Sequence, residues 1–147
     1  MLSLADQIAG GARAESDVWA ASLRGQPDWE EVFSPLAPPQ FALGLETVYE
    51  AYLVHYGKAR LFSTPDRDEA VLLGDYLYAH GLVRIAAVGG VQAVDAMSKL
   101  ISRCAALRAE GADGDGDAWL DAVRTLGGAP SDGEIARALD RHSTRLR

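Results

Sequence analysis

The sequence predicts an all-α protein, a helical bundle built around one long apolar helix. Apolar residues recur at helical spacing in several segments, and glycine and proline fall mostly between these segments. Residues 70–88 are apolar or aromatic at most positions, which is typical of a helix enclosed by others. A chain of 147 residues is long enough for one core, so we expect a single domain, 1–147.

The amino-terminal part is predicted to contain two helices separated by a loop. Residues 2–23 place apolar side chains at roughly helical spacing, although Gly10 and Gly11 weaken the middle. Three prolines at 35–39 forbid a continuous helix there. A helix follows at residues 40–57, and its apolar face is formed by Leu45, Val48, Tyr49, Tyr52 and Tyr56.

The long apolar helix is predicted to begin after Thr64. The Thr64 hydroxyl can accept hydrogen bonds from free N–H groups, Pro65 suits the first helical position, and acidic residues follow in the first turn. Gly89 and Gly90 are expected to separate this helix from an antiparallel neighbour at residues 91–110. Asp95 in that neighbour lies four residues before Lys99, a spacing that favours an ion pair.

The carboxyl-terminal part is predicted to hold an acidic loop and two shorter helices. Residues 111–117 form the loop and residues 118–126 the first helix. Ser131 and Glu134 have capping-box spacing, so a polar helix that frays at its end is expected over residues 131–146.

The acidic residues around this loop superficially resemble a calcium-binding loop. They are Asp113, Asp115, Asp117 and Asp121. Such a loop needs a glycine at its sixth position and a carboxylate at its twelfth, where this chain has Ala118 and Arg124. We therefore interpret Asp113 to Asp121 as a solvated acidic loop.

Charge and cysteine content narrow the function classes. A net charge of −7 opposes binding to nucleic acid or to an anionic membrane surface. Cys104 is the only cysteine and lies on an apolar stripe, so we expect an inert buried thiol and a cytoplasmic protein. We expect no secretory signal, because a basic start is missing, and no membrane span, because Asp75 and Arg84 interrupt the longest apolar run.

Two segments resemble the all-α trans-isoprenyl diphosphate synthases, also called polyprenyl synthetases. LGLETVYEAYLVHYG at residues 43–57 is similar to the family helix of pattern Leu-Glu-x-hydrophobic followed by Leu-Val/Ile-His. AVLLGDYLYAHG at residues 70–81 is similar to the family's AVLxGDxLxA helix. The matching positions include Glu46, His55, Gly74 and Asp75. The resemblance is not visible at either end, so the packing of 1–40 and 127–147 stays open.

The chain departs from this family at the groups that bind diphosphate. Family members hold Mg²⁺ with an aspartate-rich motif after the histidine, because a hard cation neutralises the departing pyrophosphate. Here Tyr56 and Gly57 occupy that place, with Lys58 and Arg60 nearby. The basic motif for isopentenyl diphosphate has no counterpart, and too few residues follow Asp75 for the second aspartate-rich motif.

A chain that keeps the family's core helices but lacks its diphosphate ligands resembles the small, non-catalytic subunits of heterodimeric prenyl diphosphate synthases. The resemblance implies a truncated isoprenoid synthase fold and an accessory or regulatory role in isoprenoid biosynthesis. It implies no cofactor on this chain and Mg²⁺ only on a catalytic partner. The partner would be a full-length prenyl diphosphate synthase subunit or a second copy. A stand-alone homodimer that binds an isoprenoid or other apolar ligand, and an active prenyltransferase with a rebuilt site, stay open.

Each candidate site residue also has a structural interpretation, which we favour. Asp75 would be a hydrogen-bonded helix carboxylate, and His55 a satisfied core or interface residue. Lys58, Arg60 and Arg67 could contact a partner's diphosphate, although an ordinary exposed loop is favoured. We predict no catalytic, cofactor or metal residue on this chain. The tyrosines are expected at helix contacts or a subunit interface, namely Tyr49, Tyr52, Tyr56, Tyr76 and Tyr78.

Overall fold

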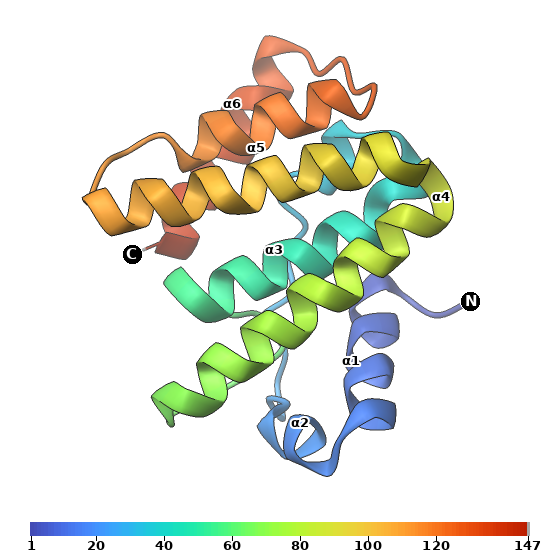
Figure 1. The fold of residues 1–147 in the computed structure, drawn as a ribbon, viewed down its shortest axis with the longest axis vertical. Coiled ribbons are helices and arrows are strands. Elements are labelled where there is room, and N and C mark those ends of the chain that lie inside the picture. The colour runs from blue at the N-terminus through green and yellow to red at the C-terminus, as the bar shows by residue number, and fades with distance from the viewer. Residues whose placement is uncertain (147) are drawn as a thin grey trace.

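The computed structural model describes residues 1–146 and confirms the predicted all-α bundle (Figure 1). No β-strand occurs among these residues, which form helices joined by loops. Short 3-10 turns lie at Ser34–Leu36 and Pro39–Phe41. The α-helices are α1 (Leu4–Glu15), α2 (Asp17–Ser22), α3 (Ala42–Tyr56), α4 (Arg67–Glu110), α5 (Asp115–Thr125) and α6 (Asp132–Leu146).

Helix α3 lies at the centre and packs along the first half of α4 (Figure 1). On one side, α1 and the loop before α4 enclose a smaller core that includes Ile8, Phe62 and Leu77. On the other side, α5, α6 and the second half of α4 enclose a larger core around Trp119 and Met97. Helix α3 is therefore buried on nearly all sides, because it contributes to both cores.

Glycines allow α3 and α4 to approach closely. A Cβ atom at Gly44 would lie 2.6 Å from Cδ1 of Ile85, and one at Gly81 would lie 2.6 Å from Cγ2 of Val48. A Cβ at Gly74 would overlap the imidazole ring of His55. Each contact joins the two helices, so a larger residue at these positions would force them apart.

Helix α4 bends sharply at Gly90, where φ is 67° and ψ is −159°. This left-handed conformation favours glycine, because a Cβ atom would strain it. Beyond the bend, the second half of α4 runs back across the molecule (Figure 1). The predicted break at Gly89 and Gly90 is confirmed, and the predicted ion pair between Asp95 and Lys99 is present at 2.8 Å.

The predictions for the first helix and for the cap of α4 were wrong. The first helix is not continuous, because Ser16 adopts an extended conformation and its hydroxyl accepts a hydrogen bond from the N–H of Val18, which starts α2. Helix α4 is capped by Asp66 and not by Thr64. The Asp66 carboxylate accepts from the N–H groups of Asp68 and Glu69, so it satisfies two free donors at once.

The capping box before α6 is confirmed. The N–H of Ser131 donates to Oε1 of Glu134 at 3.0 Å, and the N–H of Glu134 donates to the Ser131 hydroxyl at 3.3 Å. The solvated-loop interpretation was wrong for Asp115, which is buried at the start of α5. Asp121 lies on the exposed side of α5 and pairs with Arg103 at 2.8 Å.

Candidate functional site

A buried ion cluster joins α3 to the loop that follows it. The guanidinium of Arg60 is 0% exposed and lies between two carboxylates on α3. Its Nη1 lies 2.5 Å from Oε2 of Glu46, and its Nε lies 2.9 Å from Oε1 of Glu50. Because both carboxylates are also buried, the three groups depend on one another for charge compensation.

The loop backbone is bound by the same cluster. Glu50 accepts hydrogen bonds from the N–H groups of Arg60 and Leu61, at 3.0 Å and 2.8 Å to Oε2. Arg60 also donates to the carbonyl oxygen of Glu30 at 2.7 Å, and its guanidinium lies 4.2 Å from the ring centroid of Trp29. The cluster therefore holds two loops against α3.

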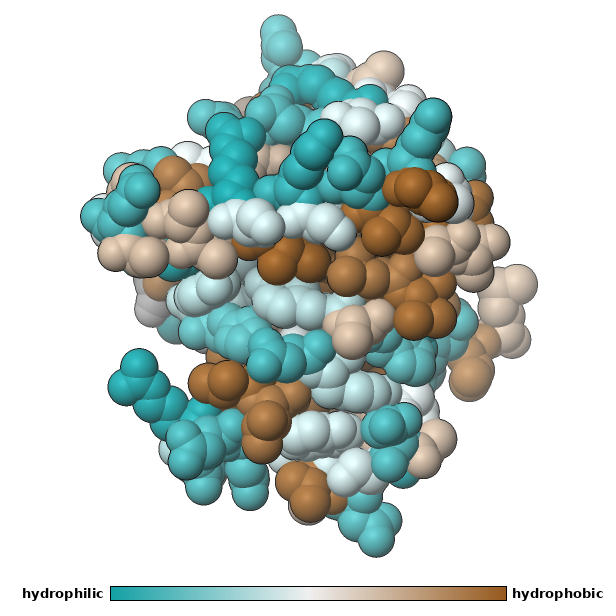
Figure 2. Space-filling model, viewed as in Figure 1, coloured by the Kyte–Doolittle hydropathy of each residue, from teal (hydrophilic) through white to brown (hydrophobic). Residues whose placement is uncertain are grey.

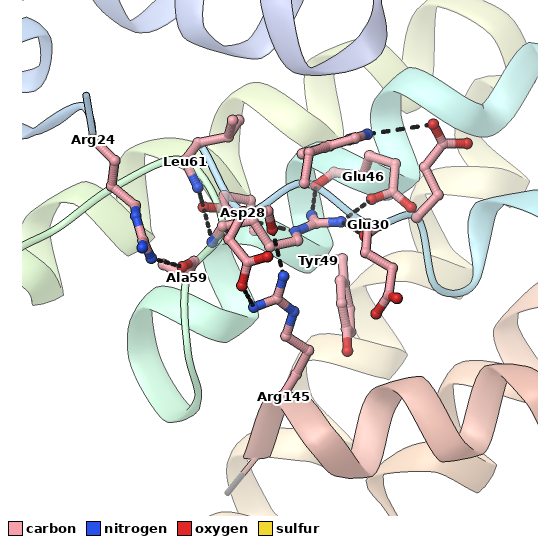
Figure 3. A network of polar contacts seen from close by, with 12 residues as sticks. Arg24, Asp28, Glu30, Glu46, Tyr49, Ala59, Leu61 and Arg145 are labelled. Carbon is pink, nitrogen blue, oxygen red and sulfur yellow. Dashed lines mark hydrogen bonds and ion pairs between the residues drawn. The ribbon is translucent and has the colours of Figure 1, made fainter. Parts of the chain in front are cut away.

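A second set of contacts extends the cluster towards α6 (Figure 3). The ring of Tyr49 lies 5.0 Å from the Arg60 guanidinium. Arg145 of α6 donates to Oδ2 of Asp28 at 2.8 Å, and Arg24 donates to the carbonyl oxygen of Ala59 at 3.1 Å. These contacts join α6 to the segment at residues 24–28, and that segment to the loop after α3.

Two carboxylates share one guanidinium in this cluster. Burial raises the pKa of Glu46 despite the attraction of Arg60. The two carboxylates in turn raise the pKa of Arg60, although burial alone would lower it. Arg60 therefore stays charged, and Glu46 is the carboxylate that protonates more readily than an exposed glutamate.

The expectation that Arg60 lies in an exposed loop was wrong. Its donors bind Glu46, Glu50 and backbone carbonyl oxygens, and no part of its side chain is exposed for a diphosphate. Arg67 is exposed in the first turn of α4. Lys58 is also exposed, and its backbone N–H donates to the carbonyl oxygen of Arg145 at 2.9 Å. A diphosphate contact by Lys58 stays a prediction.

The other family-like residues meet where α3 crosses α4. His55 packs against Gly74, stacks on Tyr78 at 5.2 Å between ring centroids, and lies 3.4 Å from the Asp75 carboxylate. Burial lowers the pKa of His55, and the nearby Asp75 partly opposes this shift. His55 is therefore mainly neutral at pH 7, while Asp75 stays largely exposed to solvent.

A third polar centre lies between α3, α5 and α6, and sequence reasoning missed it. The hydroxyl of Tyr49 lies 2.8 Å from Nδ1 of His142, and the hydroxyl of Tyr52 donates to the Asp115 carboxylate. Arg108 pairs with Asp115 at 3.0 Å. His142 is 93 residues from Tyr49 and Asp115 is 63 residues from Tyr52 in the sequence. No short-range spacing pattern therefore predicts these pairs.

Burial keeps the His142 side chain of this third centre uncharged at neutral pH. It lowers the pKa of His142 to about 4, more than the nearby Asp115 raises it. Burial also raises the pKa of both tyrosines and raises that of Cys104 to about 12. At neutral pH the two tyrosines and His142 act as hydrogen-bonding groups, and Cys104 is a protonated thiol, so no phenolate or thiolate is present to act as a base or nucleophile.

In the Arg60 cluster, at His55 and around His142, the buried acids and bases contact one another or the backbone. Burial and charge compensation therefore explain the pKa shifts in all three places. Among residues 1–146, no group of three or more His, Cys, Asp or Glu side chains is placed to hold a metal ion. The arrangement fits side chains that hold helices together.

Comparison with known proteins identifies no relative. No protein-family model, curated protein or solved structure matches this chain. The resemblance to polyprenyl synthetases therefore stays a prediction from the two segments at residues 43–57 and 70–81.

Helix α4 also exposes apolar side chains (Figure 2). By length and composition, it could cross a membrane, whereas the sequence analysis expected no span. Its most apolar window is 28% buried inside the structure. The same helix supplies Leu73, Leu77 and Ile85 to the interior, so one face of α4 packs as a core helix does.

Proposed function

We propose that this chain is a catalytically degenerate, polyprenyl-synthetase-like protein that acts as the accessory small subunit of a prenyl diphosphate synthase. One observation carries the proposal: the two family-like segments lie side by side on α3 and α4, and their distinctive residues pack against each other. Gly74 receives His55, while Glu46 binds Arg60. Residues used in this way support a scaffold that serves a partner's chemistry.

The residues that follow His55 also support an accessory role, because neither of them carries a carboxylate. The family's magnesium-binding aspartates are replaced by Tyr56 and Gly57, and the Tyr56 ring packs edge-on against Tyr52 and at a tilt against His55. A phenol with a pKa raised by burial offers no carboxylate oxygen to a hard cation. In this proposal, Mg²⁺ and both diphosphates bind to the catalytic subunit.

The proposal is tested by reconstitution. The partner is a synthase from the same genome that bears both aspartate-rich motifs. Prenyl transfer from an allylic diphosphate to isopentenyl diphosphate is assayed with each chain alone and with the mixture. We expect the mixture to gain activity or to change product length. A synthase that is complete alone and unaltered by the added chain would overturn the proposal.

Two glycine variants make this assay specific for folded α3–α4 packing. Gly81→Val places a branched side chain against Val48, so we expect the effect on the synthase to be lost. Gly10→Ala is the matched control, because a Cβ at Gly10 meets no atom within 4 Å. The control is expected to act as the wild type does.

A second candidate function is the binding of an apolar ligand by a stand-alone homodimer. The observation that favours it is a surface cavity of about 580 Å³ beside the bend of α4, where Phe41, Val91 and Leu126 line one part and the polar residues Gln92, Asp95 and Thr125 another. Cavities of this size accommodate small organic ligands. Mass spectrometry of the purified protein under native conditions tests it, and isoprenoid retained by the wild type but lost in Phe41→Glu would favour this candidate.

A further inference from the structure

A surface cavity of about 300 Å³ lies between the start of α5 and the second half of α6. Residues 114–117 line one side of it, and Leu139, His142 and Leu146 of α6 line another. The cavity borders the polar centre that His142 forms with Tyr49, and the accessory role proposed above makes no use of it. A cavity of this volume accommodates a small organic molecule.

The His142 side chain faces this cavity with one edge of its ring. His142 is 4% exposed, and its Nδ1 lies 2.8 Å from the Tyr49 hydroxyl on the side of α3. On the other edge, Cδ2 lies 3.7 Å from the position of a Cβ at Gly116, which lines the cavity. Nε2 is bonded to Cδ2 and has no hydrogen-bond partner among residues 1–146. Because a buried polar atom without a partner costs free energy, this position favours a polar ligand atom at Nε2.

The contact with Tyr49 determines which nitrogen of His142 carries the proton. The Tyr49 hydroxyl has no second hydrogen-bond partner among the described residues, so its proton is satisfied when it donates to Nδ1. Burial lowers the pKa of His142 to about 4, so the ring is neutral at pH 7 and its single proton lies on Nε2. His142 therefore presents an N–H donor on the edge that faces the cavity.

The first turn of α5 adds further donors. Its N-cap is Gly114, and no side chain caps this end of the helix. The N–H groups of Gly116 and Asp117 have no acceptor within the helix, because they lie in its first turn. Together with the Nε2–H group of His142, they place donors on two sides of the cavity.

The charges around the cavity select the class of ligand. Asp113 and Asp117 line it and are exposed, and neither has an ion-pair partner among residues 1–146. Asp115 is paired with Arg108, so the local net charge is negative and opposes a phosphate or carboxylate ligand. The N–H donors oppose a cation, and no set of three ligating side chains for a metal ion occurs in the described chain.

Hydroxyl groups match this arrangement, because each can accept from an N–H group and donate to a carboxylate. We propose that the cavity binds an uncharged polyhydroxyl molecule, either a polyol or a monosaccharide. One hydroxyl oxygen accepts from Nε2–H of His142, and another hydroxyl donates to Asp117. The C–H groups of the ligand pack against Leu139 and Leu146. This binding is independent of the accessory role, because its test uses the purified chain alone.

NMR titration of the purified chain with glycerol, myo-inositol and glucose tests the proposal. With at least one of these compounds, we expect the amide signal of Gly116 and the Nε2 signal of His142 to shift, with a dissociation constant on the order of a few millimolar. Long-range imidazole spectra should show the proton of His142 on Nε2. Inorganic phosphate and Mg²⁺, titrated separately, are expected to leave both signals unchanged.

Two matched variants identify the cavity. Asp117→Asn removes a charged acceptor from the first turn of α5, and we expect binding to weaken about 10-fold. Asp132→Asn removes an exposed carboxylate from the first turn of α6, outside the cavity, and should bind as the wild type does. Both variants are expected to fold, because both positions are exposed.

Four results would overturn the inference. They are unchanged signals with all three compounds up to about 100 mM, binding of phosphate or Mg²⁺ in their place, a His142 proton found on Nδ1, and equal affinities of the Asp117→Asn and Asp132→Asn variants.

Discussion

The interior beside α3 and the exposed apolar face of α4 reverse the usual distribution of polar and apolar groups. Charged Arg60 and Glu50 are fully buried, whereas Leu72 and Val83 face solvent only one helix away. The buried charges and the exposed apolar residues therefore have different physical roles. The buried charges hold loops to a helix, where removal of one leaves the others unpaired. The exposed apolar residues lose few contacts when they are replaced, so they add little to the stability of the fold.

The largest expected effect is on the interior side. Glu50→Ala removes the acceptor of Arg60 and of two backbone N–H groups. We expect a loss of about 3–5 kcal/mol in the free energy of unfolding, because a buried guanidinium loses a partner. Urea denaturation measures it, with the exposed Glu110→Ala as control. A loss below about 1 kcal/mol would show that the cluster does not hold the fold.

The second prediction concerns the pH dependence of the interior. The pKa of His142 is about 4 in the folded protein and 6.5 in the unfolded chain. The unfolded chain therefore binds the proton first, and stability falls as pH drops from 6.5 to 4. The contribution of this residue is at most about 3 kcal/mol.

Denaturation at a series of pH values, with His142→Asn for comparison, measures this contribution. The asparagine side chain of this variant would keep an acceptor for Tyr49 but has no titrating group in this range, so the fall in stability should become shallower. An equally steep fall in both proteins would mean that His142 is not the group responsible. His55 and His80 also have lowered pKa values and add to the slope in both proteins.

The contact between α3 and α4 should show an intermediate effect. In Gly81→Ala, the new Cβ would lie 2.6 Å from Cγ2 and 3.2 Å from the backbone nitrogen of Val48. We expect a loss of about 1–3 kcal/mol, because the backbone of α3 cannot move away freely. Gly10→Ala, in open space, should instead stabilise α1 slightly. Equal thermal midpoints for the two variants would argue against close packing.

The smallest effect on stability is expected on the exposed apolar face of α4. Val83→Glu should change the free energy of unfolding of the monomer by no more than about 0.5 kcal/mol, because an exposed side chain loses few contacts. Urea denaturation at low protein concentration measures it. A large loss there would mean that Val83 belongs to the core, and the contrast between the two regions would disappear.

Sequence periodicity was sufficient to predict the helices that carry strong local signals. The helix at residues 40–57, the break at Gly90 and the capping box at Ser131 and Glu134 depend on residues close together in the chain. The cap of α4 was misplaced because Thr64 and Asp66 are both good caps, and only the backbone path decides between them.

The polar centres could be predicted only in part. Asp75 was predicted to be a hydrogen-bonded helix carboxylate, and its carboxylate lies 3.4 Å from Nε2 of His55. The burial of Arg60 was missed because a basic residue in a loop is usually exposed. Its partners lie on α3, so the tertiary fold and not the local sequence determines its environment.

The central claim is that the family-like polar residues of this chain support packing and a partner's chemistry. The most direct measurement is prenyl transfer by the reconstituted pair when this chain carries Asp75→Asn. We expect a rate within about twofold of the wild-type pair, because loss of a general acid or base would lower the rate about 100-fold or more. A fall of that size, with folding and complex formation intact, would contradict it.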